Sequence, residues 1–166
     1  NLGTHYIKAQ GVEQNYAKAL ECYQLSAEMG VADAFYNIGV LYEEGTGVEK
    51  DYSKAFHHYQ ISAEKGSSNG LKGLGDCYKN GIGVERDYKK AFDFYNQSIA
   101  LGNSIALFSL GVLYHKGQGT EQNYSKAFEL YQKAAENNSP EAMFNIASLY
   151  SKGQGVERSQ SKAIEY

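Results

Sequence analysis

One spacing dominates this sequence, because tyrosine recurs every 36 residues along the chain without any insertion or deletion. Glycine and alanine keep the same step at other positions, which indicates a repeated structural unit. Dividing 166 residues by 36 gives about 4.6 units, or three full repeats between two partial ones. A period of this length is typical of solenoids, in which each unit packs mainly on its neighbours. The columns are Tyr6, Tyr42, Tyr78, Tyr114 and Tyr150; Gly3, Gly39, Gly75 and Gly111, with Ala147 in fifth place; and Ala19, Ala55, Ala91, Ala127 and Ala163.

Each unit carries two apolar stripes with helical spacing. The first joins Ala34, Ile38 and Leu41, and the second runs from Tyr52 to Ala63. Between the stripes lies the segment 44–50, whose glycines can end a helix and turn the chain. Short polar residues precede the second stripe and can cap its free N–H groups. The unit is therefore predicted to be a helix-turn-helix pair, with caps at Asn15, Asp51, Asp87 and Asn123.

These residues resemble the Sel-one-like repeat (SLR) family, a relative of the tetratricopeptide repeat (TPR). The resemblance rests on Ile38-Gly39, Tyr42, Gly45-x-Gly47-Val48, Asp51-Tyr52, Lys54-Ala55, Tyr59, Ala63 and Gly66, and it recurs over essentially the whole chain. Ile99, Asn138, Ser159 and Gln160 depart from the pattern.

The resemblance implies an all-α fold, a right-handed α-α superhelix of 36-residue helix-turn-helix repeats. We expect a single solenoid with a partial repeat at 1–30, repeats at 31–66, 67–102 and 103–138, and a partial repeat at 139–166. Neither end resembles a capping repeat, so a fragment of a longer array is expected.

Charge and hydropathy argue against two classes of partner. The formal net charge is −3, which gives no electrostatic footprint for nucleic acid. No apolar run of the length of a membrane span occurs, and the first residues lack a signal-peptide pattern. We therefore expect a monomer that binds a protein or peptide, without nucleic acid and without direct membrane insertion. The sequence leaves the compartment open between cytoplasm and secretion.

No cofactor, metal or catalytic site is predicted. The Gly-x-Gly loops follow helices and recur from unit to unit, which favours turns over phosphate binding. The four histidines, His5, His57, His58 and His115, lack the spacing of zinc ligands. Cys22 and Cys77 are a whole repeat apart, so a disulfide is not expected. No motif unites a serine, a histidine and an aspartate, so we expect no enzyme.

By resemblance to TPR arrays, the first helix of each unit lines a concave face that binds the partner. We expect an aromatic groove with a basic centre there, suited to an extended peptide or a partner helix of acidic character. The other interpretation, that Phe108 and Phe144 pack between adjacent first helices, stays open. The predicted partner-binding residues are Tyr36, Val40, Lys72, Asp76, Lys79, Phe108, Val112, His115 and Phe144.

Three functions follow from this reading. The first is a non-enzymatic scaffold or adaptor for protein interactions, in a bacterial protein that contacts host factors by resemblance to other SLR proteins. The second is a cell-wall or glycan-binding domain, or a hydrolase, which would need a pocket with convergent polar groups and a perturbed pKa. The third is a structural spacer without a ligand, whose concave face would be polar and featureless.

Overall fold

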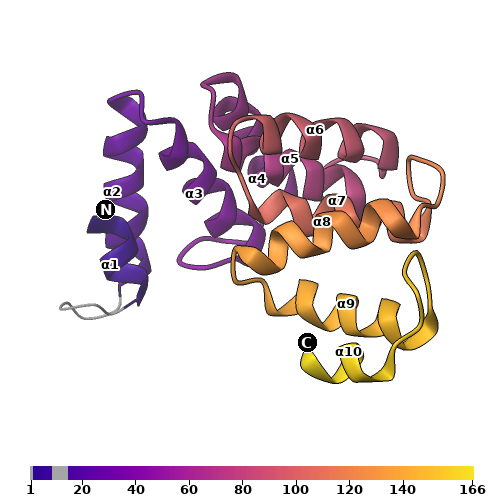
Figure 1. The fold of residues 1–166 in the computed structure, drawn as a ribbon. Coiled ribbons are helices and arrows are strands. Elements are labelled where there is room, and N and C mark those ends of the chain that lie inside the picture. The colour runs from indigo at the N-terminus through magenta and orange to yellow at the C-terminus, as the bar shows by residue number, and fades with distance from the viewer. Residues whose placement is uncertain (1, 9–14) are drawn as a thin grey trace. The chain divides into compact units, whose positions relative to one another are not determined.

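The computed structural model describes residues 2–8 and 15–166, without the side chains of residues 2, 5 and 8. The histidine prediction for His5 and part of the first predicted repeat therefore lie outside the described residues. The described residues form ten helices and no strand, so the all-α repeat fold expected from the sequence is confirmed (Figure 1). The helices are α1 Leu2–Lys8, α2 Tyr16–Glu28, α3 Ala32–Glu44, α4 Tyr52–Glu64, α5 Ser68–Asn80, α6 Tyr88–Ala100, α7 Ile105–Lys116, α8 Tyr124–Glu136, α9 Pro140–Lys152 and α10 Gln160–Glu165.

The predicted caps hold the second helix of each pair. The Asp51 carboxylate accepts the backbone N–H of Lys54 at 2.9 Å, and Asn15 and Asn123 repeat this bond at α2 and α8. Asp87 accepts two backbone N–H groups at the start of α6. Ser159, which replaces the usual acid or amide, still accepts the Lys162 N–H at 3.3 Å. Each cap satisfies N–H groups that have no partner inside the helix.

The glycine loops turn the chain and bring it close to another repeat. Gly45 ends α3 in the left-handed conformation, with φ 74°, and a glycine ends each first helix from α3 to α9 in the same way. Gly47, two residues later, also has a positive φ and lies against Tyr16 at the start of α2. A Cβ there would lie 2.5 Å from the Tyr16 side chain. The structure therefore requires glycine at both positions, at Gly45 for the backbone conformation and at Gly47 for the close contact as well.

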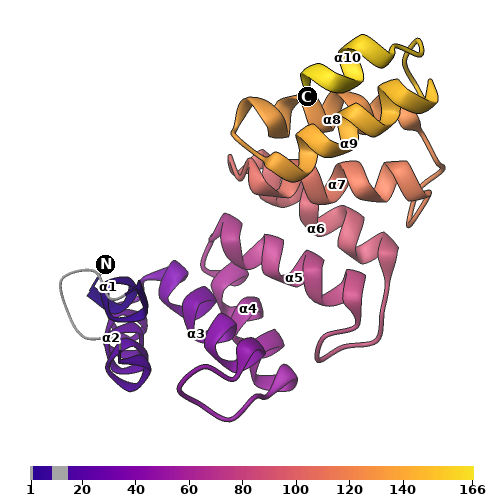
Figure 2. The same ribbon diagram turned by 90° about the horizontal axis from the view of Figure 1, so that it is seen from below.

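The chain divides into two compact units, residues 1–86 and 87–166. Within the first, α1 to α5 pack in chain order, and α3 also contacts α5. Within the second, α6 to α10 pack in chain order, and α9 and α10 lie side by side in both ribbon views (Figures 1 and 2). Each unit is therefore a stack of helix pairs.

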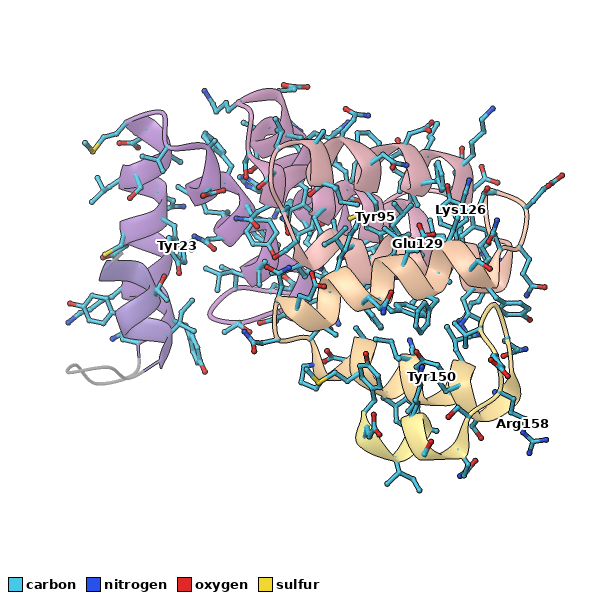
Figure 3. All side chains as sticks on the ribbon, in the orientation of Figure 1. Tyr23, Tyr95, Lys126, Glu129, Tyr150 and Arg158 are labelled. Atoms are coloured by element: carbon cyan, nitrogen blue, oxygen red, sulfur yellow. The ribbon has the colours of Figure 1, made fainter. Side chains whose placement is uncertain are left out.

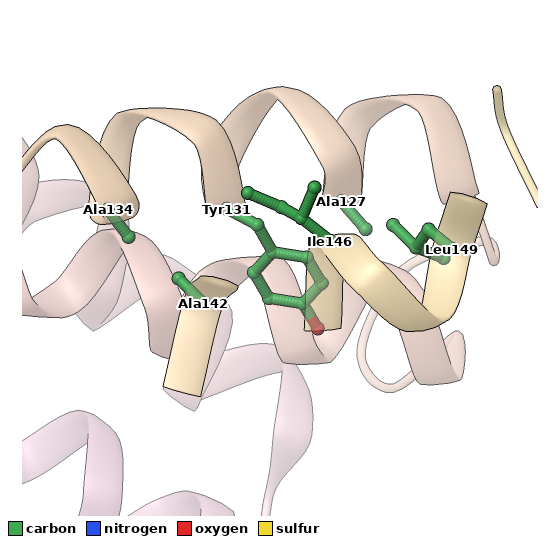
Figure 4. Close-up of a cluster of buried hydrophobic side chains, with 6 residues drawn as sticks. All are labelled: Ala127, Tyr131, Ala134, Ala142, Ile146 and Leu149. Atoms are coloured by element: carbon green, nitrogen blue, oxygen red, sulfur yellow. The ribbon is translucent and has the colours of Figure 1, made fainter. Parts of the chain in front are cut away.

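A fully buried tyrosine stands at the centre of the helix packing. Tyr131 is 1% exposed and packs with Ala127, Ala134, Ala142, Ile146 and Leu149 between α8 and α9 (Figure 4). In the first unit, the Tyr59 ring of α4 lies between Gly39 of α3 and Gly73 of α5. The small residues leave room for the ring, and an alanine without solvent exposure precedes each tyrosine by four residues. The buried pairs are Ala19 and Tyr23, Ala55 and Tyr59, Ala91 and Tyr95, and Ala127 and Tyr131.

The tyrosine column that first reveals the repeat is only half-buried. Tyr150 packs edge-on against Phe128, with ring centroids 5.3 Å apart, and Tyr78 meets Phe56 in the same way. Lysines of the second helices cover this column from the solvent side. Figure 3 marks one member of each set, Tyr150 and Lys126, and the contacts are Lys18 over Tyr6, Lys54 over Tyr42, Lys126 over Tyr114 and Lys162 over Tyr150.

Both cysteines are free thiols, as the sequence led us to expect. Cys77 is buried on α5, and burial, with the charges of Glu43 and Asp76, raises the pKa of its thiol to about 12. A thiol with so high a pKa is a poor nucleophile near pH 7.

Gly39→Ala tests the glycine contact. Alanine normally stabilises a helix by about 1 kcal/mol relative to glycine. Here its Cβ would lie 2.6 Å from the Tyr59 ring and 3.2 Å from the Ala55 carbonyl oxygen. Because the ring is enclosed, we expect unfolding by urea to show a net loss of about 1–3 kcal/mol. Lys89→Ala, on an exposed position of α6, serves as the control, and a more stable Gly39→Ala variant would contradict the packing described.

His58 makes the stability depend on pH. Its ring stacks between Phe35 and Tyr42, and its Nδ1 is buried without a hydrogen bond to any described residue. Burial, with the neighbouring His57, lowers the pKa of His58 below its ordinary value of 6.5. The unfolded chain thus binds a proton more readily, so stability is complete above about pH 6.5 and falls as the pH drops through the folded pKa. Thermal unfolding at pH 7.5 and 5 should show a smaller loss in His58→Phe than in the wild type, and equal losses would contradict the assignment.

Candidate functional site

The first helices of the N-terminal unit enclose a small pocket. Tyr36, Val40 and Glu43 follow each other at helical spacing on α3, and Lys72 and Asp76 are one turn apart on α5. Since α3 and α5 contact each other, these stripes face one space of about 180 Å³. We name it the α3–α5 pocket; it is lined by Tyr36, Val40, Glu43, Glu44, Tyr59, Lys72, Gly73 and Asp76.

The lysines predicted as a basic centre are both paired with one carboxylate. Lys72 Nζ lies 2.6 Å from Asp76 Oδ2, and Lys79 Nζ lies 3.6 Å from Asp76 Oδ1. The three side chains are each about a quarter exposed. Asp76 thus offsets part of the positive charge that the sequence suggested for this face, and Glu43 and Glu44 add two more carboxylates to the pocket.

Tyr59 reaches the pocket from the second helix of the repeat. The Tyr59 hydroxyl donates a hydrogen bond of 2.6 Å to Glu43 Oε2, and the ring centroids of Tyr59 and Tyr36 are 5.5 Å apart. The phenol is thus buried among apolar atoms with its polar end satisfied at the pocket. The bond fixes one oxygen of the Glu43 carboxylate, and the other has no hydrogen bond within the described part of the chain.

Every resolved shift in the pocket raises a pKa that already lies well above 7. Burial raises the pKa of Tyr36, and Asp76, Glu43 and Glu44 raise it further against the opposing charge of Lys72. Burial alone would lower the pKa of Lys72, but Asp76, Tyr36 and Glu43 outweigh it, so the lysine pKa is raised. Burial and the hydrogen bond to Glu43 also raise the pKa of Tyr59. The phenols stay neutral and the lysine stays charged near pH 7, which suits binding better than general base catalysis.

Asp33 extends the polar surface of α3 by one turn. Its Oδ1 accepts hydrogen bonds from the Ser67 hydroxyl and, at 3.3 Å, from the Asn69 amide. Ser67 also caps α5, because its Oγ accepts the Gly70 N–H. This network links the start of α3 to the start of α5.

In the C-terminal unit, the predicted residues lie on α7 and α9. The Phe108 ring packs on buried Tyr131 with centroids 5.8 Å apart, and Val112 packs against the same core cluster. The ring of His115 lies 5.3 Å from Tyr124 in an edge-to-face contact. We name Phe108, Val112, His115 and Phe144 the C-terminal set.

Phe144 differs from the rest of this set. It is 75% exposed, whereas Phe108 and Val112 are half-buried against the cluster. The sequence left open whether Phe108 and Phe144 pack inside the protein or face a partner. In the structure, Phe108 packs largely against the core cluster, whereas Phe144 lies mostly in solvent.

His115 is neutral at pH 7 in this environment. Burial, followed by the charges of Lys152 and Lys116, lowers the pKa of its imidazole. Neither His115 nor any other described residue belongs to a group of three histidines, cysteines or carboxylates that could hold a metal ion.

The sequence alone does not place Tyr59 at the pocket, because Tyr59 belongs to the apolar stripe of the second helix. One signal was present: the column holds tyrosine rather than phenylalanine at Tyr23, Tyr59, Tyr95 and Tyr131. A buried phenol usually finds a hydrogen-bond partner, so a polar group near the ring's end could have been expected. Thr4 approaches the Tyr23 hydroxyl at 3.2 Å, and Asn145 bonds that of Tyr131.

None of the helices in the described ranges is both long and apolar enough to cross a lipid bilayer. A stack of antiparallel helix pairs with a 36-residue repeat defines the chain as an α-helical repeat protein of the TPR-like class.

The chain belongs to the Sel1 repeat family. The family model matches residues 1–31, 32–67, 69–103, 104–139 and 140–166. Sel1 repeat proteins are generally protein-interaction scaffolds, and their fold is typically non-catalytic.

Solved structures of Sel1 repeat proteins are similar over nearly the whole chain. A Sel1 repeat protein from Oxalobacter formigenes is 31% identical over 99% of this chain and 65% of its own, with a TM-score of 0.87. The protein c5321, a protective antigen present in uropathogenic Escherichia coli strains, is 33% identical over 98% of this chain, with a TM-score of 0.82. This chain spans only 35% of c5321.

More distant structures share the fold alone. The immunity protein PA5087 from Pseudomonas aeruginosa is 24% identical over 99% of this chain and 63% of its own, with a TM-score of 0.66. A sequence comparison with curated proteins finds no match.

Asp76→Asn tests the charge balance of the α3–α5 pocket. The amide cannot compensate two ammonium groups that are largely buried, so we expect a loss of about 1–3 kcal/mol in the free energy of unfolding. Asp93→Asn removes the same charge from an exposed position of α6 and should change stability by less than about 0.5 kcal/mol. Equal effects of the two variants in urea unfolding would show that the ion pairs contribute nothing.

Proposed function

We propose that this chain is a non-enzymatic scaffold that binds a peptide or helix of a partner protein on the faces of its first helices. Phe144 carries the proposal. An aromatic side chain that leaves 75% of its surface in water gains little from folding, whereas burial against a partner would remove that surface from water. The α3–α5 pocket supports the proposal independently, because it offers tyrosine rings and charged groups on the equivalent face of other first helices.

Two other functions are less well supported. A hydrolase or glycan-binding domain would require convergent polar groups in a pocket. The α3–α5 pocket has them, but at about 180 Å³ it is smaller than the roughly 300–1,000 Å³ of ordinary ligand sites. Its resolved pKa shifts also lie in the direction that disfavours proton transfer near pH 7. A spacer without a ligand does not account for the exposed aromatic ring.

The origin of the partner is also a proposal. A similar protein of which this chain spans 35% is a protective antigen of uropathogenic E. coli. We therefore propose that host proteins be tested as partners beside bacterial ones.

Phe144→Ala tests the surface. Because the ring is mostly in water, the variant should unfold within about 0.5 kcal/mol of the wild type, while partner binding weakens about tenfold. The measurement is capture of native and host-cell proteins on immobilised chain, followed by titration of each captured protein.

Leu101→Ala is the matched control for this prediction. Leu101 is 55% exposed and follows α6, away from the first-helix positions. A photo-cross-linking residue placed at position 144 should also label the captured partner, and one at position 101 should not. Binding that depends on Leu101 and not on Phe144 would contradict the proposed surface.

A further inference from the structure

We infer that the α3–α5 pocket receives the side chain of an arginine from the partner protein, held by Glu43 and by the Tyr36 ring. The inference rests on the proposed function, since the arginine belongs to the bound peptide or helix. It differs from the sequence-based expectation, which took Lys72 and Lys79 as the groups that select an acidic partner.

The charges of the pocket favour a cation. Three carboxylates, those of Glu43, Glu44 and Asp76, line it together with a single ammonium, that of Lys72. Lys79 lies next to Asp76, Asp33 lies one turn before Tyr36, and Lys50 interacts electrostatically with Glu43, so these three further charges add one positive charge and do not reverse the sign. The surface thus keeps a net negative charge, to which a cationic side chain is complementary.

The behaviour of Lys72 supports this conclusion. Burial favours a neutral lysine, yet Asp76, Tyr36 and Glu43 together hold its ammonium charged. Lys72 therefore acts as a resident cation of the pocket. Because it lies 2.6 Å from Asp76, it leaves the Glu43 carboxylate unpaired by any salt bridge among the described residues.

Glu43 is positioned to accept a second donor. The Tyr59 hydroxyl holds its Oε2 at 2.6 Å, which limits the movement of the carboxylate, and Oε1 has no described donor. A carboxylate that is already oriented loses less freedom when it binds. A guanidinium offers several N–H donors in one plane, and it forms stronger hydrogen bonds with a carboxylate than a neutral donor does.

The tyrosine rings favour arginine over other cations. Tyr36 is half-buried on the pocket wall and leans on Tyr59, with the two ring planes 34° apart. A planar guanidinium can stack on a tyrosine face while its edge bonds a carboxylate, which the compact ammonium of lysine does less well. Val40 adds an apolar wall for the methylene stem of the side chain.

The size of the pocket restricts what enters it. About 180 Å³ accommodates one side chain, whereas cofactors and drug-sized ligands occupy larger sites. A single anchoring residue of a partner is therefore the class of ligand that fits both the volume and the charge.

Three short peptides that differ in one side chain provide the test. They are N-acetyl-Gly-Arg-Gly-amide, its citrulline analogue, which has a similar shape without the charge, and its glutamate analogue. Each is titrated into the 15N-labelled chain at low salt, and amide chemical shifts are followed by NMR. We expect the arginine peptide to shift the signals of α3 and α5 around Tyr36, Glu43 and Lys72, with affinity about tenfold above that of the citrulline peptide.

Variants separate the pocket from general charge attraction. Glu43→Gln keeps an oxygen that can accept the Tyr59 hydroxyl, and it should weaken arginine-peptide binding about tenfold. Glu64→Gln removes the same charge from an exposed site at the end of α4 and should leave the affinity unchanged. Circular dichroism is used to check that both variants are folded.

The outcomes are distinct. Shifts confined to the pocket, with an affinity about tenfold lower in Glu43→Gln and unchanged in Glu64→Gln, would establish the site. No shifts up to 50 mM peptide (roughly the weakest binding such a titration detects), equal binding of arginine and citrulline, or preferential binding of the glutamate peptide would each overturn it. A captured protein whose binding depends on Phe144 but not on Glu43 would refute the arginine site and leave the proposed scaffold standing. Arginine-peptide binding without any captured protein would refute the scaffold instead.

Discussion

The close approach of helices around a buried tyrosine is the central packing contact of the repeat. Gly39 and Gly73 leave no side chain where the Tyr59 ring lies, and a Cβ at either position would come within 3 Å of that ring. The ring is long enough to cross the interior of a repeat and to bring its hydroxyl to the far side. A leucine or phenylalanine would fill part of the same space, but it would leave no polar group at the end.

The same tyrosine connects the core to the surface that we propose to bind partners. Its hydroxyl fixes the Glu43 carboxylate, and Glu43 lies on the stripe of α3 that also carries Tyr36 and Val40. The charge of this surface is set by residues one helical turn apart, since Asp76 lies between Lys72 and Lys79 on α5. A repeat frame that is uniform inside can thus present different chemistry outside in each unit. The aromatic residues Phe108 and Phe144 do this in the C-terminal unit.

Loop glycines and helix caps make the frame regular. Gly45 and its equivalents turn the chain after the first helices α3, α5, α7 and α9, and Asp51 and its equivalents start each second helix with a side-chain hydrogen bond. Because these devices are local, they act in the same way wherever they recur in the described residues, even where Ser159 replaces the acid. The lysines that cover the half-buried tyrosines are equally periodic. The polar residues of the first helices follow no such repetition.

The period, the helix pairs, the caps and the family can all be inferred from the sequence, because they depend on local spacing and on a backbone conformation that any repeat of the pattern adopts. The sequence could not distinguish the fully buried tyrosines from the half-buried column of Tyr42, since both share helical spacing with the core. Three features become visible only in the folded chain: Asp76 neutralises part of the charge of Lys72 and Lys79, Tyr59 bonds Glu43, and Phe144 stays in water while Phe108 packs on Tyr131. Each of these depends on which side chains from different helices meet, and that is fixed by packing rather than by position in the chain.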